Sequence, residues 1–367
     1  MELYNWQKKE WPHFSYEEKD VEIELYAFTE KSGMVSGILK ALPEGSQDET
    51  IIDIIVSEAI KTSEIEGEFL SREDVISSVR QNLGLIPGVP VKDKRAKGVS
   101  SLMVLSRNTY LEPLSEKMLF HWHTLLMGHI KEISKGSWRS GSEPMQVISG
   151  AAGNIKVHFE APPSERVPSE MRTFIKWFNE SGPGGGREIL KAPLRSAIAH
   201  LWFESIHPFE NGNGRIGRAI AEKALSQGFG RPLLLSLSKA IESDRKRYYS
   251  ELQTAQRTLE VTSWVKYFVT TLLRAQRDAE TEIDFTLRKV KFYDRFKNQL
   301  NARQSAVIKK MLDEGPKGFQ GGMSAGKYAR ICRVSKATAT RDLQYLAVLG
   351  ALLVAGGGRS TIYQVNV

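Results

Sequence analysis

The sequence predicts a mainly α-helical protein with a β-hairpin near its middle and a winged helix-turn-helix at its C-terminus. Three observations indicate this. Apolar residues recur at three- and four-residue spacings through most of the 367 residues. Short apolar runs flank a glycine-containing segment between Trp138 and Phe159, and the last 65 residues change to short helical patterns and two apolar runs. A chain of this length fits two or three domains.

Two segments show the helical spacing most clearly. The first contains Ile51, Ile52, Ile55, Val56, Ala59 and Ile60, and the second contains Leu190, Leu194, Ile198, Leu201 and Trp202. Clusters of turn-forming residues at 84–90 and 181–186 separate the helical blocks. The short apolar runs around 150–154 predict a hairpin at 138–159 rather than a helix.

Three helices and a hairpin are expected in the C-terminal segment. A helix at 303–313 precedes two helical patterns that are divided at 333–335, and Ser335 is the expected N-cap of the second. This last helix has a polar side with Lys336, Thr338, Thr340 and Arg341, and an apolar side with Ala339, Leu343, Leu346 and Leu349. Residues 352–355 and 361–365 flank a glycine tip at 356–358, which predicts the hairpin of a winged helix.

Positive charge is concentrated at the C-terminus. The net charge is +8, and residues 301–367 hold ten Lys or Arg against three Asp or Glu, which gives +7 for this segment. A basic segment with a winged helix indicates a polyanionic partner, and a solvated surface is the alternative. No apolar run of about 18 residues and no signal-peptide pattern occurs, so we expect a cytoplasmic protein without a membrane partner. The single cysteine, Cys332, cannot form a disulfide within the chain.

Residues 207–218 carry the clearest chemistry. They read His-Pro-Phe-Glu-Asn-Gly-Asn-Gly-Arg-Ile-Gly-Arg and end in a helical pattern. Glycines at the start of a helix expose backbone N–H groups to an anion, and the helix dipole favours negative charge there. Arg215 and Arg218 lie three residues apart, so both side chains can reach phosphate oxygens. His207, at the rim, can take a proton from an attacking hydroxyl.

This segment resembles the signature of the Fic family, with eight fixed positions matched in order. The resemblance implies a Fic-type helical bundle with a β-hairpin flap, and transfer of AMP from ATP to a Ser, Thr or Tyr hydroxyl of a target protein. It makes His207 the base and assigns the nucleotide site to Gly212, Asn213, Gly214, Arg215, Arg218, Tyr248 and Tyr249. Mg²⁺ is expected at Asn211, where the family usually has Asp or Glu. A neutral amide should hold the ion more weakly than a carboxylate.

Two further segments fit the resemblance, which covers about residues 95–275. Upstream of it, Thr62 and Glu66 match the family's inhibitory helix, which implies that Glu66 pairs with Arg218 and obstructs the γ-phosphate. Val157, His158 and Phe159 match part of the hairpin flap that aligns the target by β-augmentation. An ordinary hairpin edge is the alternative for these three residues.

The sequence therefore predicts four regions: an N-terminal helical region with the inhibitory helix at 1–90, a Fic catalytic core at 95–275, a linking helix at 276–300 and a winged-helix domain at 301–367. The predicted function is a self-inhibited protein adenylyltransferase that uses ATP and Mg²⁺ and acts on a target protein, and a homodimer is left open. One alternative is a nucleotide-sensing regulator that binds DNA through Lys336, Thr338, Arg341 and Arg359. Others are protein docking by the winged helix, and a Fic enzyme that transfers another phosphate-containing group.

Overall fold

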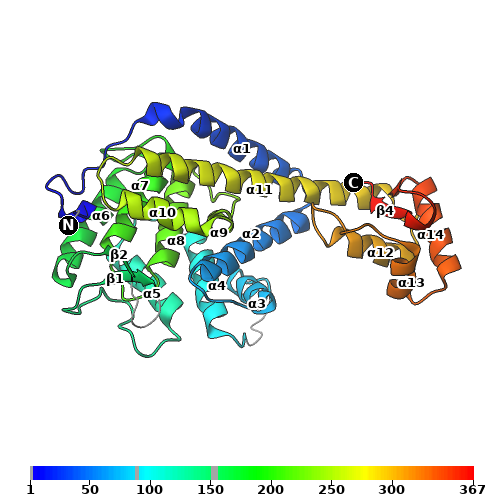
Figure 1. Cartoon of the computed structure of the whole chain (residues 1–367), viewed down its shortest axis with the longest axis horizontal. Coiled ribbons are helices and arrows are strands. Elements are labelled where there is room, and N and C mark those ends of the chain that lie inside the picture. The colour runs from blue at the N-terminus through cyan, green and yellow to red at the C-terminus, as the bar shows by residue number, and fades with distance from the viewer. Residues whose placement is uncertain (1–2, 87–90, 150–155) are drawn as a thin grey trace. The chain divides into compact units, whose positions relative to one another are not determined.

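The computed structural model describes residues 3–86, 91–149 and 156–367, and Figure 1 follows them from the N-terminus in blue to the C-terminus in red. The chain divides into two compact units. The first comprises residues 1–33 and 51–277, and the second comprises residues 34–50 and 278–367. Each unit has its own apolar core.

The first unit is mainly helical. Its helices are α3 (Arg72–Asn82), α4 (Lys94–Asn108), α5 (Glu116–Met127), α6 (Val167–Glu180), α7 (Ala192–Ile206), α8 (Asn213–Gly228), α9 (Leu237–Glu242) and α10 (Arg245–Ala255). Three longer helices have residues in both units: α1 (Glu22–Lys40), α2 (Glu44–Ile65) and α11 (Thr262–Arg295). Short 3₁₀ helices are η1 (Asn5–Gln7), η2 (Glu18–Val21), η3 (Ser164–Arg166) and, in the second unit, η4 (Gly358–Ser360). Among the described residues, no helix has both the length and the apolar character needed to cross a bilayer.

Helix α7 lies at the centre of the first unit and packs along α8. All of its residues are buried, which is expected for a helix that is surrounded by others. Leu190, which fits the helical spacing in the sequence, precedes α7 and is 83% exposed. A proline in the first turn of α7 fixes the beginning of the helix after that residue.

The predicted hairpin is present in the middle of the chain. Strands β1 (Gln146–Ser149) and β2 (Lys156–Glu160) pair antiparallel, and the glycine-containing connection that was predicted at 150–154 lies outside the described residues. Phe159 is buried in a small cluster with Trp6 and Ala161. The Trp6 indole also donates a hydrogen bond to the Glu160 carbonyl over 2.7 Å. Trp6, near the N-terminus, therefore packs against β2 and stabilises the hairpin.

The second unit contains the predicted helices and C-terminal hairpin. They are α12 (Ala302–Leu312), α13 (Ala325–Cys332), α14 (Lys336–Val348), β3 (Leu352–Ala355) and β4 (Ile362–Val365). The Ser335 hydroxyl caps α14 by accepting a hydrogen bond from the Thr338 N–H over 3.1 Å. Ala339, Leu343 and Leu346 are buried on the predicted apolar side of α14. Residues 276–295 are the C-terminal part of α11, which continues from Thr262 without a break.

Candidate active site

The connection between α7 and α8 is shaped by two residues with left-handed backbone. His207 directly follows α7 with φ of 50°, and Gly212 caps the start of α8 with φ of 81°. Asn213, the first residue of α8, accepts a hydrogen bond from the Phe209 N–H over 2.9 Å and donates one to the Phe209 carbonyl over 2.8 Å. Asn213, predicted to contact nucleotide, is buried and closes this loop on itself. The loop thus fixes the start of α8 relative to His207.

A carboxylate occupies the start of α8. Glu66, just after the end of α2, accepts a hydrogen bond from Arg218 Nη2 over 2.8 Å. A Cβ on Gly214 would clash with Glu66 Oε1, so this glycine lets the carboxylate approach the backbone of α8. The N-terminus of a helix favours an anion through its N–H groups and its dipole. Glu66 therefore lies in a position that favours an anion.

Arg218 is held by the end of α2 in two ways. Its Nε donates to the Thr62 hydroxyl over 2.8 Å, and Nη2 donates to the Thr62 carbonyl over 3.0 Å as well as to Glu66. Burial by itself lowers the pKa of Arg218, but the Glu66 carboxylate raises it above its usual value. The guanidinium thus keeps its charge in a buried position. Thr62 and Glu66, four residues apart on α2 and the turn after it, form one clamp on this side chain.

The second arginine of the segment is also paired, which the sequence analysis missed. Arg215 Nη1 donates to Glu68 Oε2 over 2.8 Å, and the Arg215 side chain is 2% exposed. The sequence signal that could have indicated this pair is the second acidic residue, Glu68, which follows Glu66 two positions later, after Gly67. One short segment after α2 therefore neutralises both arginines that were predicted to bind phosphates.

The surroundings of His207 favour its neutral imidazole. Burial lowers the pKa of His207 to about 4, and the Arg139 charge acts in the same direction. The imidazole is therefore neutral near pH 7 and can accept a proton. Arg139 Nε donates to the His207 carbonyl over 2.8 Å, which holds the unusual backbone of this residue. A second buried group that the sequence analysis missed is Glu204, whose Oε2 lies 3.8 Å from His207 Nδ1.

The two tyrosines predicted for the nucleotide site have different surroundings. Tyr248 is 2% exposed, and its hydroxyl is hydrogen bonded to His200 Nε2 of α7 over 2.8 Å. Tyr249 is half-buried, and its hydroxyl donates to the Ile65 carbonyl over 3.4 Å. Tyr248 therefore supports the core around α7, whereas Tyr249 contacts the end of α2 close to Glu66.

Asn211 can contribute one weak metal ligand. Its side chain is exposed, and its Oδ1 accepts a hydrogen bond from the Gly212 N–H over 2.6 Å. Within residues 3–86, 91–149 and 156–367, no group of three or more His, Cys, Asp or Glu is arranged to hold a metal ion. Mg²⁺ commonly keeps several waters and binds through one or two protein oxygens together with substrate phosphates. The exposed amide oxygen of Asn211 is compatible with that mode.

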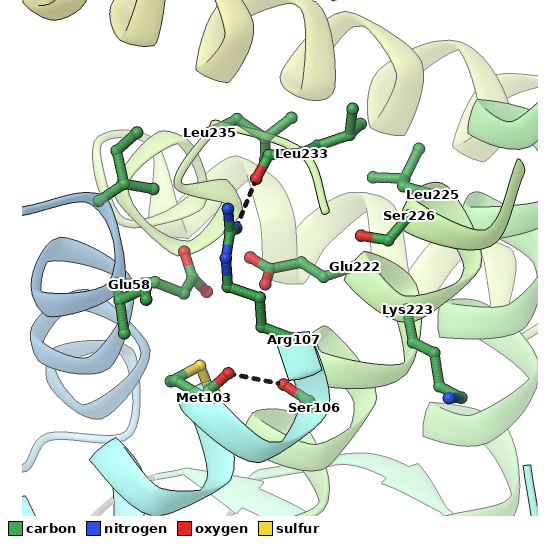
Figure 2. Close-up of a pocket in the computed structure, with 12 residues that line it drawn as sticks. Glu58, Met103, Ser106, Arg107, Glu222, Lys223, Leu225, Ser226, Leu233 and Leu235 are labelled. Atoms are coloured by element: carbon green, nitrogen blue, oxygen red, sulfur yellow. Dashed lines mark hydrogen bonds between the residues drawn. The ribbon is translucent and has the colours of Figure 1, made fainter. Parts of the chain in front are cut away.

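A small polar cavity lies behind the site and joins α2, α4 and α8. Figure 2 shows Glu58, Arg107 and Glu222 facing one another, with Arg107 donating to the Leu233 carbonyl over 2.9 Å. Glu58 also accepts hydrogen bonds from Ser236 and Ser238. Burial raises the pKa of Glu58 and, well above its usual value, that of Glu222. The cavity of about 30 Å³ has room for water but not for a nucleotide, so the cluster connects the helices.

The three predicted flap residues differ in exposure. Val157 is 40% exposed and pairs across the hairpin with Ile148, which is 53% exposed. His158 Nδ1 is hydrogen bonded to Gln253 Nε2 over 2.9 Å, and Phe159 is buried. Val157 thus presents an apolar surface, while the other two anchor the strand.

The predicted DNA-binding residues belong to the second unit. Lys336 and Arg341 are exposed on α14, and Thr338 is half-buried with its hydroxyl hydrogen bonded to that of Ser335 over 3.0 Å. The side chain of Arg359 lies outside the described part of the chain. Lys336 and Arg341 are therefore both exposed on α14, five residues apart along the helix.

Comparison with known proteins defines the class. Residues 4–85 match a domain of unknown function (DUF4172), and residues 113–225 match the Fic/DOC family. A probable protein adenylyltransferase of Aquifex aeolicus is 29% identical over 164 residues, which are 44% of this chain and 43% of that protein. A protein adenylyltransferase Fic of Culex quinquefasciatus is 28% identical over 140 residues, which are 38% of this chain and 24% of that protein. The chain thus spans less than half the length of either relative.

Solved structures show the same fold. A Fic family protein from Desulfovibrio desulfuricans has a TM-score of 0.53 at 19% identity, covering 94% of this chain and 96% of that chain. A Fic protein of C. elegans has a TM-score of 0.51 at 18% identity, covering 75% and 74%. Residues 113–225 are thus similar to the Fic/DOC family and residues 4–85 to DUF4172, and the chain shows distant similarity to proteins named as protein adenylyltransferases. The predicted mainly helical Fic fold with a small hairpin is confirmed.

Proposed function

We propose that this protein is a protein adenylyltransferase that Glu66 holds in a self-inhibited state. One observation carries the proposal: the Glu66 carboxylate lies on the bare backbone of Gly214 and on Arg218, at the N-terminus of α8. That position offers positive charge and N–H donors to an anion, so the carboxylate occupies a site suited to a phosphate. The named relatives support nucleotidyl transfer as the reaction.

The proposed reaction uses His207 and the two arginines. His207 takes the proton of the target hydroxyl, and the hydroxyl oxygen forms a bond to the α-phosphorus of ATP. The bond between that phosphorus and the leaving pyrophosphate breaks. Arg215 and Arg218, once free of Glu68 and Glu66, offset the negative charge of the outer phosphates. Asn211 would hold Mg²⁺, which supplies further charge neutralisation at the phosphates when it is bound with ATP.

The hairpin suits a role in holding the target. Ile148 and Val157 form an exposed apolar pair, while Phe159 fixes the strand from the other face. An extended target segment could pair with the hairpin by backbone hydrogen bonds and place its hydroxyl near His207. We therefore propose the hairpin as the target-binding flap.

The experiment compares Glu66→Gly with the double variant Glu66→Gly/His207→Ala in cell lysate, using ATP labelled at either the α- or the γ-phosphate. AMP transfer predicts protein labelling from α-labelled ATP alone, and its loss in the double variant. Labelling from γ-labelled ATP alone would instead establish phosphoryl transfer. Absence of labelling with both nucleotides, or full labelling without His207, would refute the proposed reaction.

A second candidate activity concerns the second unit. We propose that α12, α13, α14 and the β3–β4 hairpin form a winged helix that binds DNA. Lys336 and Arg341 lie exposed on α14, in a segment whose net charge is +7 from ten basic and three acidic residues at 301–367. Basic side chains on such a helix bind phosphates and make affinity fall as salt rises.

Titration of the full chain with a DNA duplex at increasing salt tests this activity. The variant Lys336→Glu/Arg341→Glu should bind more weakly and with a smaller dependence on salt, because two phosphate contacts are lost. Lys309→Glu/Lys310→Glu, on α12, is the matched control for net charge. No binding at low salt, or equal losses in both variants, would favour protein docking or a merely solvated surface.

A further inference from the structure

Glu204 is a buried carboxyl group beside the proposed base. It belongs to the last turn of α7, is 5% exposed, and has its Oε2 3.8 Å from His207 Nδ1. Within the described part of the chain, Glu204 Oε1 and His207 Nδ1 are both buried without a hydrogen-bond partner. Buried polar atoms are usually paired, so the unpaired Nδ1 of His207 suggests a contact that forms during function, and the side-chain oxygen of Glu204 that faces it is Oε2, at 3.8 Å.

Gly217 makes room for this carboxyl group. A Cβ on Gly217 would clash with Glu204 Oε1, and its next neighbour would be His200 Nδ1 at 3.3 Å. Glycine within a helix is destabilising relative to alanine, and Gly217 lies inside α8. The close approach of Glu204 gives a physical reason for glycine at this position.

We propose that Glu204 is a positioning residue that accepts the Nδ1–H of His207 and thereby leaves Nε2 free to take the proton of the target hydroxyl. The inference rests on the proposed function, in which His207 is the base. A distance of 3.8 Å exceeds a hydrogen bond, but contacts of this kind are often long before substrate binds and shorten in the complex. A carboxylate in this place also stabilises the imidazolium that forms when His207 takes the proton.

The protonation of Glu204 decides which nitrogen of His207 can act. A protonated Glu204 would donate to Nδ1, so that Nε2 carries the ring proton and cannot serve as the base. Burial raises the pKa of Glu204 to about 8; Arg218 acts against this rise and Glu66 adds to it. Release of Glu66 from the site would therefore leave Arg218 to favour the carboxylate. The other charged or titratable groups that face this pair are Arg139, His200, Tyr248 and Tyr249.

Another acceptor for Nδ1–H must be considered. The backbone carbonyl of Glu204 also faces the imidazole, although it already accepts a hydrogen bond from Gln256 Nε2 over 3.2 Å. If that carbonyl were sufficient, the side chain of Glu204 would have no effect on His207. The two cases differ in what Glu204→Gln does, because the backbone carbonyl is unchanged in this variant.

The first test measures AMP incorporation against pH in the Glu66→Gly background. The parent should gain activity as Glu204 ionises on the way to pH 8. Glu204→Gln should lower kcat at least tenfold, leave KM for ATP within a factor of about three, and remove this pH-dependent step. Gly217→Ala should also lower kcat and weaken the pH-dependent step, because the added methyl group displaces the Glu204 carboxyl group. Gly33→Ala is the matched control, since a Cβ there meets no atom within 4 Å.

The second test is independent of activity and reads the ring nitrogens of His207 by NMR, with the signals assigned by their loss in His207→Ala. The expected result is an Nδ1–H tautomer at pH 9 that becomes less populated in Glu204→Gln. An unchanged tautomer and unchanged imidazole pKa in Glu204→Gln would overturn the proposal, as would an unchanged pH profile with normal kcat. If no AMP is incorporated by any variant, the proposed function fails and the nitrogen signals alone decide the role of Glu204.

Discussion

Replacing Glu66 by glycine removes the carboxylate from the start of α8 and frees Arg218. The carboxylate and the γ-phosphate are proposed to compete for the same guanidinium, so its removal should let ATP bind in a productive pose. Thr62 keeps its two hydrogen bonds to Arg218, which hold the side chain in place after Glu66 is gone. We therefore predict that Glu66→Gly raises AMP incorporation.

The structure sets the size of the effect. A hydrogen bond to a charged group contributes about 1.5–3 kcal/mol. The side chain of Glu66 is 30% exposed while that of Arg218 is 1% exposed, so water screens the pair in part and the lower end of the range applies. About 1.5 kcal/mol corresponds to roughly a tenfold increase in rate. Glu66 lies in the turn after α2, so its replacement by glycine removes no residue from the helix.

Incorporation of α-labelled AMP is measured at equal concentrations of wild type, Glu66→Gly and Glu66→Gly/Arg218→Ala. The double variant should lose the gain, because both changes act through one guanidinium. Glu64→Gly, at the end of α2, is the control for a glutamate-to-glycine change in this segment that leaves the Arg218 contact in place, since Glu64 pairs with Lys61. Equal incorporation by wild type and Glu66→Gly, or an equal gain in Glu64→Gly, would refute self-inhibition by Glu66.

Three further predictions follow from single positions. His207→Ala should abolish transfer yet change the Kd for ATP less than about threefold by calorimetry, because the imidazole acts on the hydroxyl; a large loss of affinity would make it a nucleotide ligand instead. Asn211→Asp should raise the rate and the apparent affinity for Mg²⁺ in a metal titration, because a carboxylate is a stronger ligand than an amide, and a fall in both would exclude this position as a ligand. Burial raises the pKa of Glu222, so the native state keeps a proton that the unfolded chain releases at lower pH. The free energy of unfolding should therefore fall as pH rises from the unfolded-state pKa of about 4 through the raised native-state pKa. Thermal unfolding from pH 5 to 9 should show a smaller fall in Tm for Glu222→Gln than for wild type, and parallel curves would contradict this account.

Much of the fold could be predicted from local sequence patterns. The helical spacing at 51–60, the divided helices around Ser335 and the glycine tip at 356–358 each depend on residues close together in the chain. Local signals were weaker at helix boundaries. The helical spacing of apolar residues extends back to Leu190, whereas α7 begins later, where a proline fixes its first turn. Local sequence also carries no signal for the hydrogen bond between the buried Tyr248 hydroxyl and His200, which lies 48 residues away in sequence.

The sequence by itself determined the class of the protein and the segment 207–218, because the chemistry of a helix N-terminus with glycines and arginines is contained in adjacent residues. The resemblance already implied that Glu66 pairs with Arg218, which the structure shows across 152 positions of the chain. Only the tertiary structure revealed the other contacts: Arg215 pairs with Glu68 across 147 positions, and Gly217 gives space to Glu204. Such contacts arise when packing brings α2 and α7 against α8, and no local spacing encodes them. The reason is physical: a charge or a missing Cβ acquires its role from the groups that burial places within a few ångströms of it.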